Sequence, residues 1–250
     1  MFRRVATIFA ETMRDAGASA PMVGIVSQSL ATMIERIEFG LTRGIDTFQF
    51  SLPNWSVTSD KEMRQVFAEI CGRFPQARFL HYNLMRSGRL VRPGDYAELA
   101  DRHPNLVATK YGGGDPFMIS GLMRQAPQLT HFLTEQGYYL GAPLGPAALL
   151  TSISSSNPAR ARQYLDAGIG GDAVLFTRLY RELCGVLHAL LDAAGTQFVD
   201  GAYDKAIHKL SEPDFPLRLL APYESTTDEV FRRYRDTLVA DFPEWLPTIG

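Results

Sequence analysis

A lysine at the end of an apolar run is the residue of this sequence best suited to covalent chemistry. Lys110 closes the run that starts at Asn105 and continues Leu-Val-Ala-Thr, and Tyr111-Gly112-Gly113-Gly114-Asp115 follows at once. The run predicts a buried strand, and desolvation at such a position lowers the pKa of an amine toward the range of a nucleophile. A nucleophilic amine can form a Schiff base with a carbonyl substrate. The other three lysines stand in polar or helical contexts: Lys61, Lys205 and Lys209.

A tyrosine at the end of a second predicted strand is the candidate acid/base. Residues 78–82 read Arg-Phe-Leu-His-Tyr, and Tyr82 precedes Lys110 by 28 residues. Side chains alternate along a strand, so Tyr82 points to one face of the sheet and His81 points outward, toward the helices. If the two strands are adjacent, Tyr82 and Lys110 reach the same edge of the sheet. A phenol there could pass protons to and from the substrate oxygens.

The composition is that of a globular enzyme. Hydrophobic residues make up 46% and charged residues 21%, and the formal net charge is −2. This balance gives no basic surface of the kind that nucleic-acid binding requires, and no apolar run approaches the length of a membrane span. The two cysteines, Cys71 and Cys184, are far apart and lack metal-ligand spacing, which favours reduced thiols in a cytoplasmic protein. The five histidines also lack metal-ligand spacing and are interpreted as structural or surface residues.

Alternating strands and helices predict an α/β fold with parallel strands. Helix starts are indicated by the capping box of Ser59 and Glu62 and by the Asp115-Pro116 and Asn157-Pro158 pairs. A (β/α)8 TIM barrel is favoured over an open sheet because the catalytic candidates fall at the ends of different strands. After residue 157 the pattern is entirely helical. Six strands are expected, at residues 21–26, 45–52, 78–82, 105–110, 129–134 and 148–154.

The number of strands predicts an incomplete barrel. A closed eight-unit barrel takes about 250 residues, yet all six expected strands lie before residue 157. We therefore expect two N-terminal βα units, roughly 60 residues, to be absent. The predicted division is a barrel lacking its first two strands over 1–156, and the last barrel helix with a C-terminal helical extension over 157–250.

These motifs together resemble the dihydrodipicolinate synthase and N-acetylneuraminate lyase family of class I pyruvate aldolases. The resemblance is carried by His81-Tyr82-Asn83-Leu84 with Gly88, and by the strand ending in Lys110 with its glycine-rich turn. Pro53-Asn54-Trp55 resembles the loop after barrel strand four. The segment from Asp204-Lys205 to Pro222 resembles the family's C-terminal helices.

The resemblance implies a Schiff-base lyase or aldolase that acts on a 2-oxo acid of the pyruvate type and an aldehyde. It implies Lys110 as the nucleophile and Tyr82 as the acid/base, with no cofactor and no metal. It further implies a cytoplasmic homo-oligomer, a tetramer or a dimer. Five residues are the candidates for substrate binding: Asn54, Trp55, Arg86, Gly112 and Ser152.

The sequence departs from the family pattern in three places. The Gly-Thr-Thr-Gly-Glu-like turn that supplies donors for the pyruvate carboxylate would lie upstream of Met1. Asn54-Trp55 stands where the synthases carry a tyrosine pair, and the loop containing Arg86 is one residue shorter than theirs. These differences point away from the lysine-biosynthetic reaction and toward a bulkier or aromatic aldehyde.

Other interpretations of the same residues stay open at this stage. Lys110 could be a structural lysine and Tyr82 a core tyrosine. The three glycines could form a flexible turn, or a nest of amides for the phosphate of a pyridoxal phosphate enzyme. Trp55 could be a packing or subunit-contact residue. The alternative function is an inactive or truncated barrel that only binds 2-oxo acids.

Overall fold

The computed structural model describes residues 1–18 and 21–247, which form two compact units. Unit 1 spans residues 1–148 and unit 2 spans residues 149–250. The division predicted after residue 156, which leaves the last barrel helix and the helical extension in the second part, stays a prediction.

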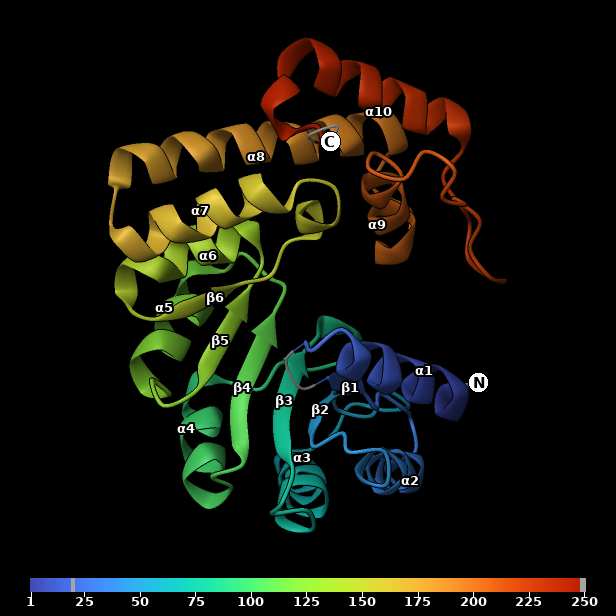
Figure 1. Ribbon diagram of the computed structural model, residues 1–250. Helices are drawn as coiled ribbons and strands as arrows, with labels where there is room; N and C mark the ends of the chain where they lie inside the picture. Colours follow the sequence, from blue (N-terminus) through green and yellow to red (C-terminus); the bar gives the residue numbers. More distant parts are fainter. Residues whose placement is uncertain (19–20, 248–250) are drawn as a thin grey trace. The chain divides into compact units, whose positions relative to one another are not determined.

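One six-stranded sheet is the scaffold of unit 1, with its last strand at the unit boundary, and its strands follow one another in sequence order (Figure 1). The pairs from β1 to β5 are all parallel, as the alternating pattern predicts. Within the described residues, β1 and β6 stand at the two ends of this order and the sheet does not close on itself. The strands are β1 (Met22–Gly24), β2 (Thr47–Phe50), β3 (Arg78–Asn83), β4 (Leu106–Tyr111), β5 (Thr130–Leu133) and β6 (Ala147–Leu149).

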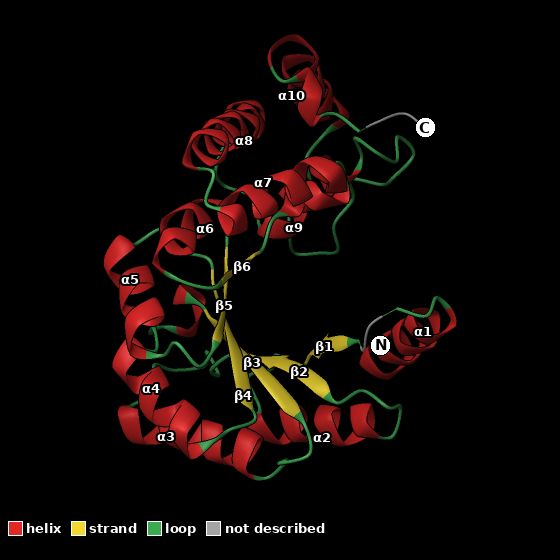
Figure 2. Ribbon diagram, turned by 60° about the vertical axis from the view of Figure 1, so that its left-hand side comes forward, coloured by secondary structure: helices red, strands yellow, loops and turns green. Residues whose placement is uncertain are grey.

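Helices α2 to α5 run along the outer face of the strands (Figure 2). Aromatic side chains fill the space between the two layers: the ring of Phe50 on β2 lies 5.1 Å from that of Phe67 on α3 and 6.1 Å from that of Phe79 on β3. All three are fully buried. The helices of this unit are α1 (Phe2–Asp15), α2 (Leu30–Leu41), α3 (Asp60–Phe67, continued by the π-helix Ala68–Gly72), α4 (Pro93–Arg102), α5 (Pro116–Gln125) and α6 (Glu135–Gly141).

Side chains cap the helices where the sequence predicts them. Ser59 and Glu62 form the reciprocal capping box that opens α3, at 3.2 and 2.7 Å. The Asp115 carboxylate accepts the backbone N–H of Phe117 at 2.9 Å and starts α5. Asn157 does the same for Arg160 at the start of α7. Each cap satisfies an amide that has no partner inside the helix.

Unit 2 is helical, as expected. Its helix α8 packs on both α7 and α10, and a short 3₁₀ helix, η4 (Ser152–Ser155), contacts α7 and α9. The helices are α7 (Pro158–Gly170), α8 (Ala173–Ala194), α9 (Asp200–His208) and α10 (Asp228–Asp241). In the part of the chain that the structure describes, no helix combines the length and the apolar character needed to cross a membrane.

The sixth strand was predicted wrongly at its C-terminal end. A strand over 148–154 was expected, whereas β6 ends at Leu149 and η4 begins at Ser152. Serine hydroxyls cause the change, because Ser154 and Ser155 donate to the carbonyls of Thr151 and Ser152, each at 2.8 Å. Such local bonds compete with the pairing of a strand. The sequence also gave no indication of α6.

Candidate active site

Tyr82 and Lys110 lie side by side at the carboxyl ends of β3 and β4. They are register partners in the parallel pair, and the Lys110 ammonium nitrogen lies 3.8 Å from the centre of the Tyr82 ring. Both side chains are half-buried. The pairing expected from the sequence is therefore present, with the amine and the phenol on the same edge of the sheet.

Strand alternation places these two side chains on the inner face. Their predecessors, His81 and Thr109, are buried on the opposite face, and His81 contacts Phe67 of α3 and Tyr96 of α4. Since His81 faces the helices, Tyr82 faces away from them. The strand around Lys110 is buried as predicted, although the lysine side chain itself keeps some contact with solvent.

The glycine run after Lys110 is a close-packed turn. A Cβ atom on Gly113 would overlap the Tyr111 hydroxyl, and one on Gly114 would overlap the Gln136 side chain. A Cβ on Gly112 would lie 3.8 Å from the Tyr82 hydroxyl, so this glycine borders the candidate site. None of the three has a positive φ, so the run lacks the left-handed residue of a nest that alternates right- and left-handed residues.

Asn83, directly after Tyr82, holds the next loop in place, a role that the sequence did not reveal. Its amide nitrogen donates to the carbonyl of Val91 and its amide oxygen accepts the Val91 N–H, both at 2.9 Å. Asn83 is 2% exposed. The two bonds close the loop of residues 84–90, whose conformation includes Gly88 at φ 78°.

The loops after β2 and β3 are tied together by an arginine. Arg89 donates to the Thr58 carbonyl at 2.9 Å and to the Asp60 carboxylate at 2.7 Å. The hydrogen bond from Arg89 holds the pKa of Asp60 below its ordinary value, more strongly than the charges of Arg89 and Arg92 do. Gly88 lies against Val57, where a Cβ would come within 2.8 Å of the valine side chain.

Three candidate substrate-binding residues lie on these loops. Asn54 and Trp55 follow β2 and are exposed, and 85% of the Trp55 surface is accessible. Trp55 is therefore not a core residue of this chain. Packing was one of the interpretations that the sequence left open. Arg86 is exposed on the short 3₁₀ helix Met85–Ser87. Two strand ends thus carry these residues to the edge where Tyr82 and Lys110 lie.

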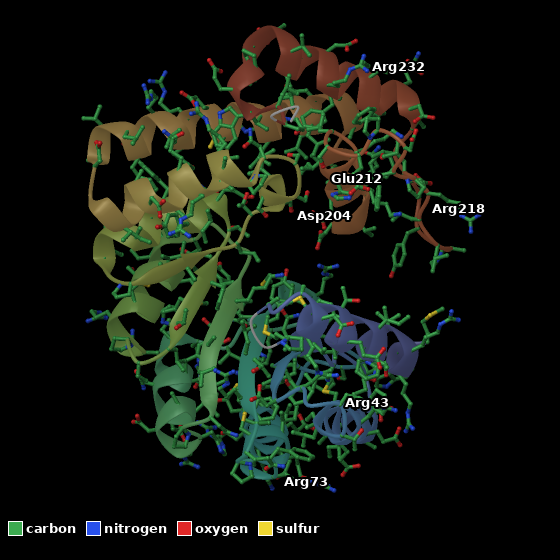
Figure 3. The ribbon with its side chains drawn as sticks, viewed as in Figure 1. Arg43, Arg73, Asp204, Glu212, Arg218 and Arg232 are labelled. Atoms are coloured by element: carbon green, nitrogen blue, oxygen red, sulfur yellow. The ribbon has the colours of Figure 1, made fainter. Side chains whose placement is uncertain are left out.

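Ser152 belongs to unit 2 and to a different group of side chains. Its hydroxyl donates to the Asp204 carboxylate of α9 at 2.6 Å, and Figure 3 labels Asp204 on that helix. A cavity of about 310 Å³ lies between η4 and α9. It is lined by Ser152, Ser154, Ser155, Asp204, Lys205, His208 and Phe215.

The described side chains offer no obvious metal centre. Among residues 1–18 and 21–247, no three His, Cys, Asp or Glu side chains gather closely enough to hold a metal ion. The chemistry available at the edge of β3 and β4 is that of an amine and a phenol.

The sequence matches no protein-family model and no curated protein, so the comparison rests on structure. YagE, a prophage protein of the dihydrodipicolinic acid synthase family from E. coli K12 solved in complex with pyruvate, superposes with a TM-score of 0.82. The match covers 96% of this chain and 80% of YagE, at 14% identity. The fold is that of the dihydrodipicolinate synthase family.

Two further structures agree. Dihydrodipicolinate synthase from Aquifex aeolicus gives a TM-score of 0.80 at 16% identity, covering 100% of this chain and 83% of that one. CdNal from Clostridium difficile in complex with mannosamine gives 0.80 at 16% identity, with coverage of 96% and 80%. The resemblance inferred from the Tyr82 and Lys110 motifs is thus confirmed at the level of the fold, which has six strands in one sheet with helices around it.

Proposed function

We propose that the protein is a class I aldolase or lyase that forms a Schiff base between Lys110 and a 2-oxo acid of the pyruvate type. The observation that carries the proposal is the placement of the Lys110 ammonium 3.8 Å from the centre of the Tyr82 ring, at the carboxyl end of a parallel pair. In barrels of this kind, catalytic groups lie at the carboxyl ends of the strands. The pyruvate complex of YagE, which has the same fold, supports the choice of substrate class.

The chemistry would begin with addition of the Lys110 amine to the ketone carbon. The resulting carbinolamine loses water to give an imine, and protonation makes the imine an electron sink. The adjacent carbon can then lose a proton and attack an aldehyde, or the reverse reaction can break a carbon–carbon bond. Tyr82 would donate and accept the protons at the carbinolamine and aldehyde oxygens.

The loops that border the two side chains would admit the aldehyde. Trp55, at 85% exposure, offers an aromatic surface after β2, and Arg86 offers a guanidinium after β3. The Asn83 and Arg89 bonds hold these loops to each other and to the strand end. We propose Asn54, Trp55, Arg86 and Gly112 as the substrate-binding residues of this edge, and retain Ser152 as a candidate in unit 2.

Borohydride trapping tests the proposal directly. Pyruvate with borohydride should add one reduced pyruvate to the intact mass, and peptide mapping should place it on Lys110. Lys110→Arg should abolish the adduct, whereas Lys205→Arg and Lys209→Arg should not. No adduct with pyruvate, or an adduct on Lys205 or Lys209 in its place, would overturn the mechanism.

A further inference from the structure

A row of outward-facing side chains lies directly behind the row that contains Tyr82 and Lys110. Phe50 pairs with His81, His81 with Thr109, and Thr109 with His131 as register partners across four adjacent strands. Tyr82 follows His81 on β3, and Lys110 follows Thr109 on β4. Both histidines and the threonine are at most 1% exposed. A polar row this deeply buried calls for a physical explanation, since buried polar groups are costly unless they are hydrogen-bonded.

The first polar contact of this row joins β4 to β5. The Thr109 hydroxyl lies 2.7 Å from Nδ1 of His131, and Nε2 of His131 lies 3.0 Å from the carbonyl oxygen of Ala126. A carbonyl can only accept, so Nε2 carries a proton. Burial lowers the pKa of His131, so the ring is neutral and Nδ1 accepts from Thr109. The His131 ring therefore fixes the direction of the Thr109 hydroxyl. The ring is itself hydrogen-bonded to Ala126, the residue that follows α5.

The second polar contact joins β3 to α4. Nδ1 of His81 lies 2.6 Å from the Tyr96 hydroxyl, and both rings are fully buried. Burial lowers the pKa of His81 to about 3, so the ring is neutral and carries one N–H. Among the residues that the structure describes, Nε2 has no hydrogen-bond partner. If Tyr96 donates to Nδ1, the N–H of His81 is on Nε2. The ring centres of Phe50 and Phe67 each lie 5.0 Å from the centre of the His81 ring. An N–H directed at aromatic rings is a weak but real interaction.

We propose that His81 and Thr109 are positioning residues, whose hydrogen bonds to Tyr96 and His131 set the rotation of β3 and β4 and so hold the Lys110 ammonium over the Tyr82 ring. Consecutive side chains on a strand share one rigid backbone and point to opposite faces. A directional bond at position 109 therefore constrains position 110, and a bond at 81 constrains 82. Apolar side chains could fill the same space without fixing a direction. The kinetic part of this proposal rests on the proposed function, and its geometric part does not.

Two substitutions that each remove a hydroxyl group test the proposal while nearly preserving the shape of the side chain. Thr109→Val removes the donor to His131, and Tyr96→Phe removes the partner of His81. Matched controls exist in unit 2: the hydroxyls of Thr226 and Tyr234 are buried and have no hydrogen-bond partner within residues 1–18 and 21–247. Thr226→Val and Tyr234→Phe thus delete the same groups without breaking a bond. Thr109→Ser keeps the hydroxyl and serves as the rescue variant.

The geometric readout is the NMR spectrum of the lysine side chains. The sequence has only four lysines, so ¹³C-lysine labelling gives few signals, and Lys110→Arg identifies the one from Lys110. The Tyr82 ring should shift the signals of the Lys110 side-chain protons upfield. This shift should shrink in Thr109→Val and Tyr96→Phe, and persist in Thr109→Ser and in both controls. A shift equal to wild type in both hydroxyl deletions would overturn the proposal, even if these variants unfold more easily.

The kinetic readout separates this proposal from the proposed function. With saturating pyruvate, the rate constant for trapping Lys110 should fall by up to about a hundredfold in Thr109→Val and Tyr96→Phe, because small displacements of reacting groups are costly. The apparent affinity for pyruvate should change less. If wild type forms no adduct, the proposed function fails, and the Lys110 shift still decides whether the row positions the lysine. Unchanged trapping rates in both deletions, with wild type active, would contradict the kinetic part.

Discussion

Asn83 holds the backbone of Val91 by two hydrogen bonds of 2.9 Å, one donated and one accepted by the same side-chain amide. Asn83 directly follows Tyr82, and its buried side-chain amide closes the loop that carries Arg86. The conformation of the candidate substrate loop therefore depends on a buried residue that is not itself a substrate-binding candidate.

Replacing Asn83 by leucine should destabilise the protein strongly. The change leaves the N–H and C=O of Val91 without partners in a buried place, and each such group costs about 1–3 kcal/mol. We expect the free energy of unfolding to fall by about 2–5 kcal/mol in urea titrations. Gln76→Leu, at an exposed position, should change it by less than about 0.5 kcal/mol. A difference between the two variants below 1 kcal/mol would show that the loop finds other partners.

Tyr82→Phe should slow turnover while leaving the fold intact. The variant keeps the ring beside Lys110 and removes only the hydroxyl, so a general acid/base contribution of about a hundredfold or more in kcat should disappear. KM for pyruvate should change little. Tyr223→Phe is a suitable control because Tyr223 is 58% exposed. Equal kcat values for Tyr82→Phe and wild type would remove Tyr82 from the mechanism.

Ser59→Ala should weaken the start of α3. Its side chain accepts the Glu62 N–H, and the Glu62 carboxylate accepts the Ser59 N–H in return. Loss of such a cap costs about 1 kcal/mol, which thermal unfolding followed by circular dichroism can resolve. Ser56→Ala, three residues earlier on an exposed stretch, is the control. If the two variants unfold at the same temperature, the cap contributes nothing measurable.

Features that depend on neighbouring residues were predictable from the sequence. The caps at Ser59, Asp115 and Asn157 involve bonds within three residues, and the parallel order follows from alternating strands and helices. The meeting of Tyr82 and Lys110 followed from the same alternation, because the carboxyl ends of adjacent parallel strands share an edge.

Features that depend on contacts distant in sequence were not predictable. Nothing near Thr109 indicates His131, which is 22 residues away, and nothing in the loop after Asn83 marks Val91 as its partner. The end of β6 is a different case: serine favours turns, and Ser154 and Ser155 bond to carbonyls three residues before them, so the strand was extended too far against a local signal. The helix α6 was missed because it is seven residues long and has no side-chain cap. A polar side chain that can bond to several different groups produces no periodic pattern in the sequence.

The buried histidines also make stability depend on pH. Burial lowers the pKa of His81 from 6.5 to about 3 and lowers that of His131 as well. Between about pH 3 and pH 6.5 the histidines therefore bind protons in the unfolded chain but not in the folded chain. The free energy of unfolding consequently rises with pH across this range. The carboxylates whose pKa is lowered, such as Glu62 and Glu98, lose their contribution only near and below 4.5.

Between pH 6.5 and 4.5 the protein should therefore lose stability as the solution becomes more acidic, and His81→Leu should lose less of it. One such histidine contributes a slope of up to about 1.4 kcal/mol per pH unit. Urea unfolding at both pH values measures the slope for wild type, for His81→Leu and for Phe79→Leu. The last variant is the control, because it removes a buried ring on the same face of β3 without removing a titrating group, so its stability should be lower by the same amount at both pH values. A His81→Leu slope equal to that of wild type would mean that His81 is protonated in the folded chain, and the neutral ring inferred beside Tyr96 would be wrong.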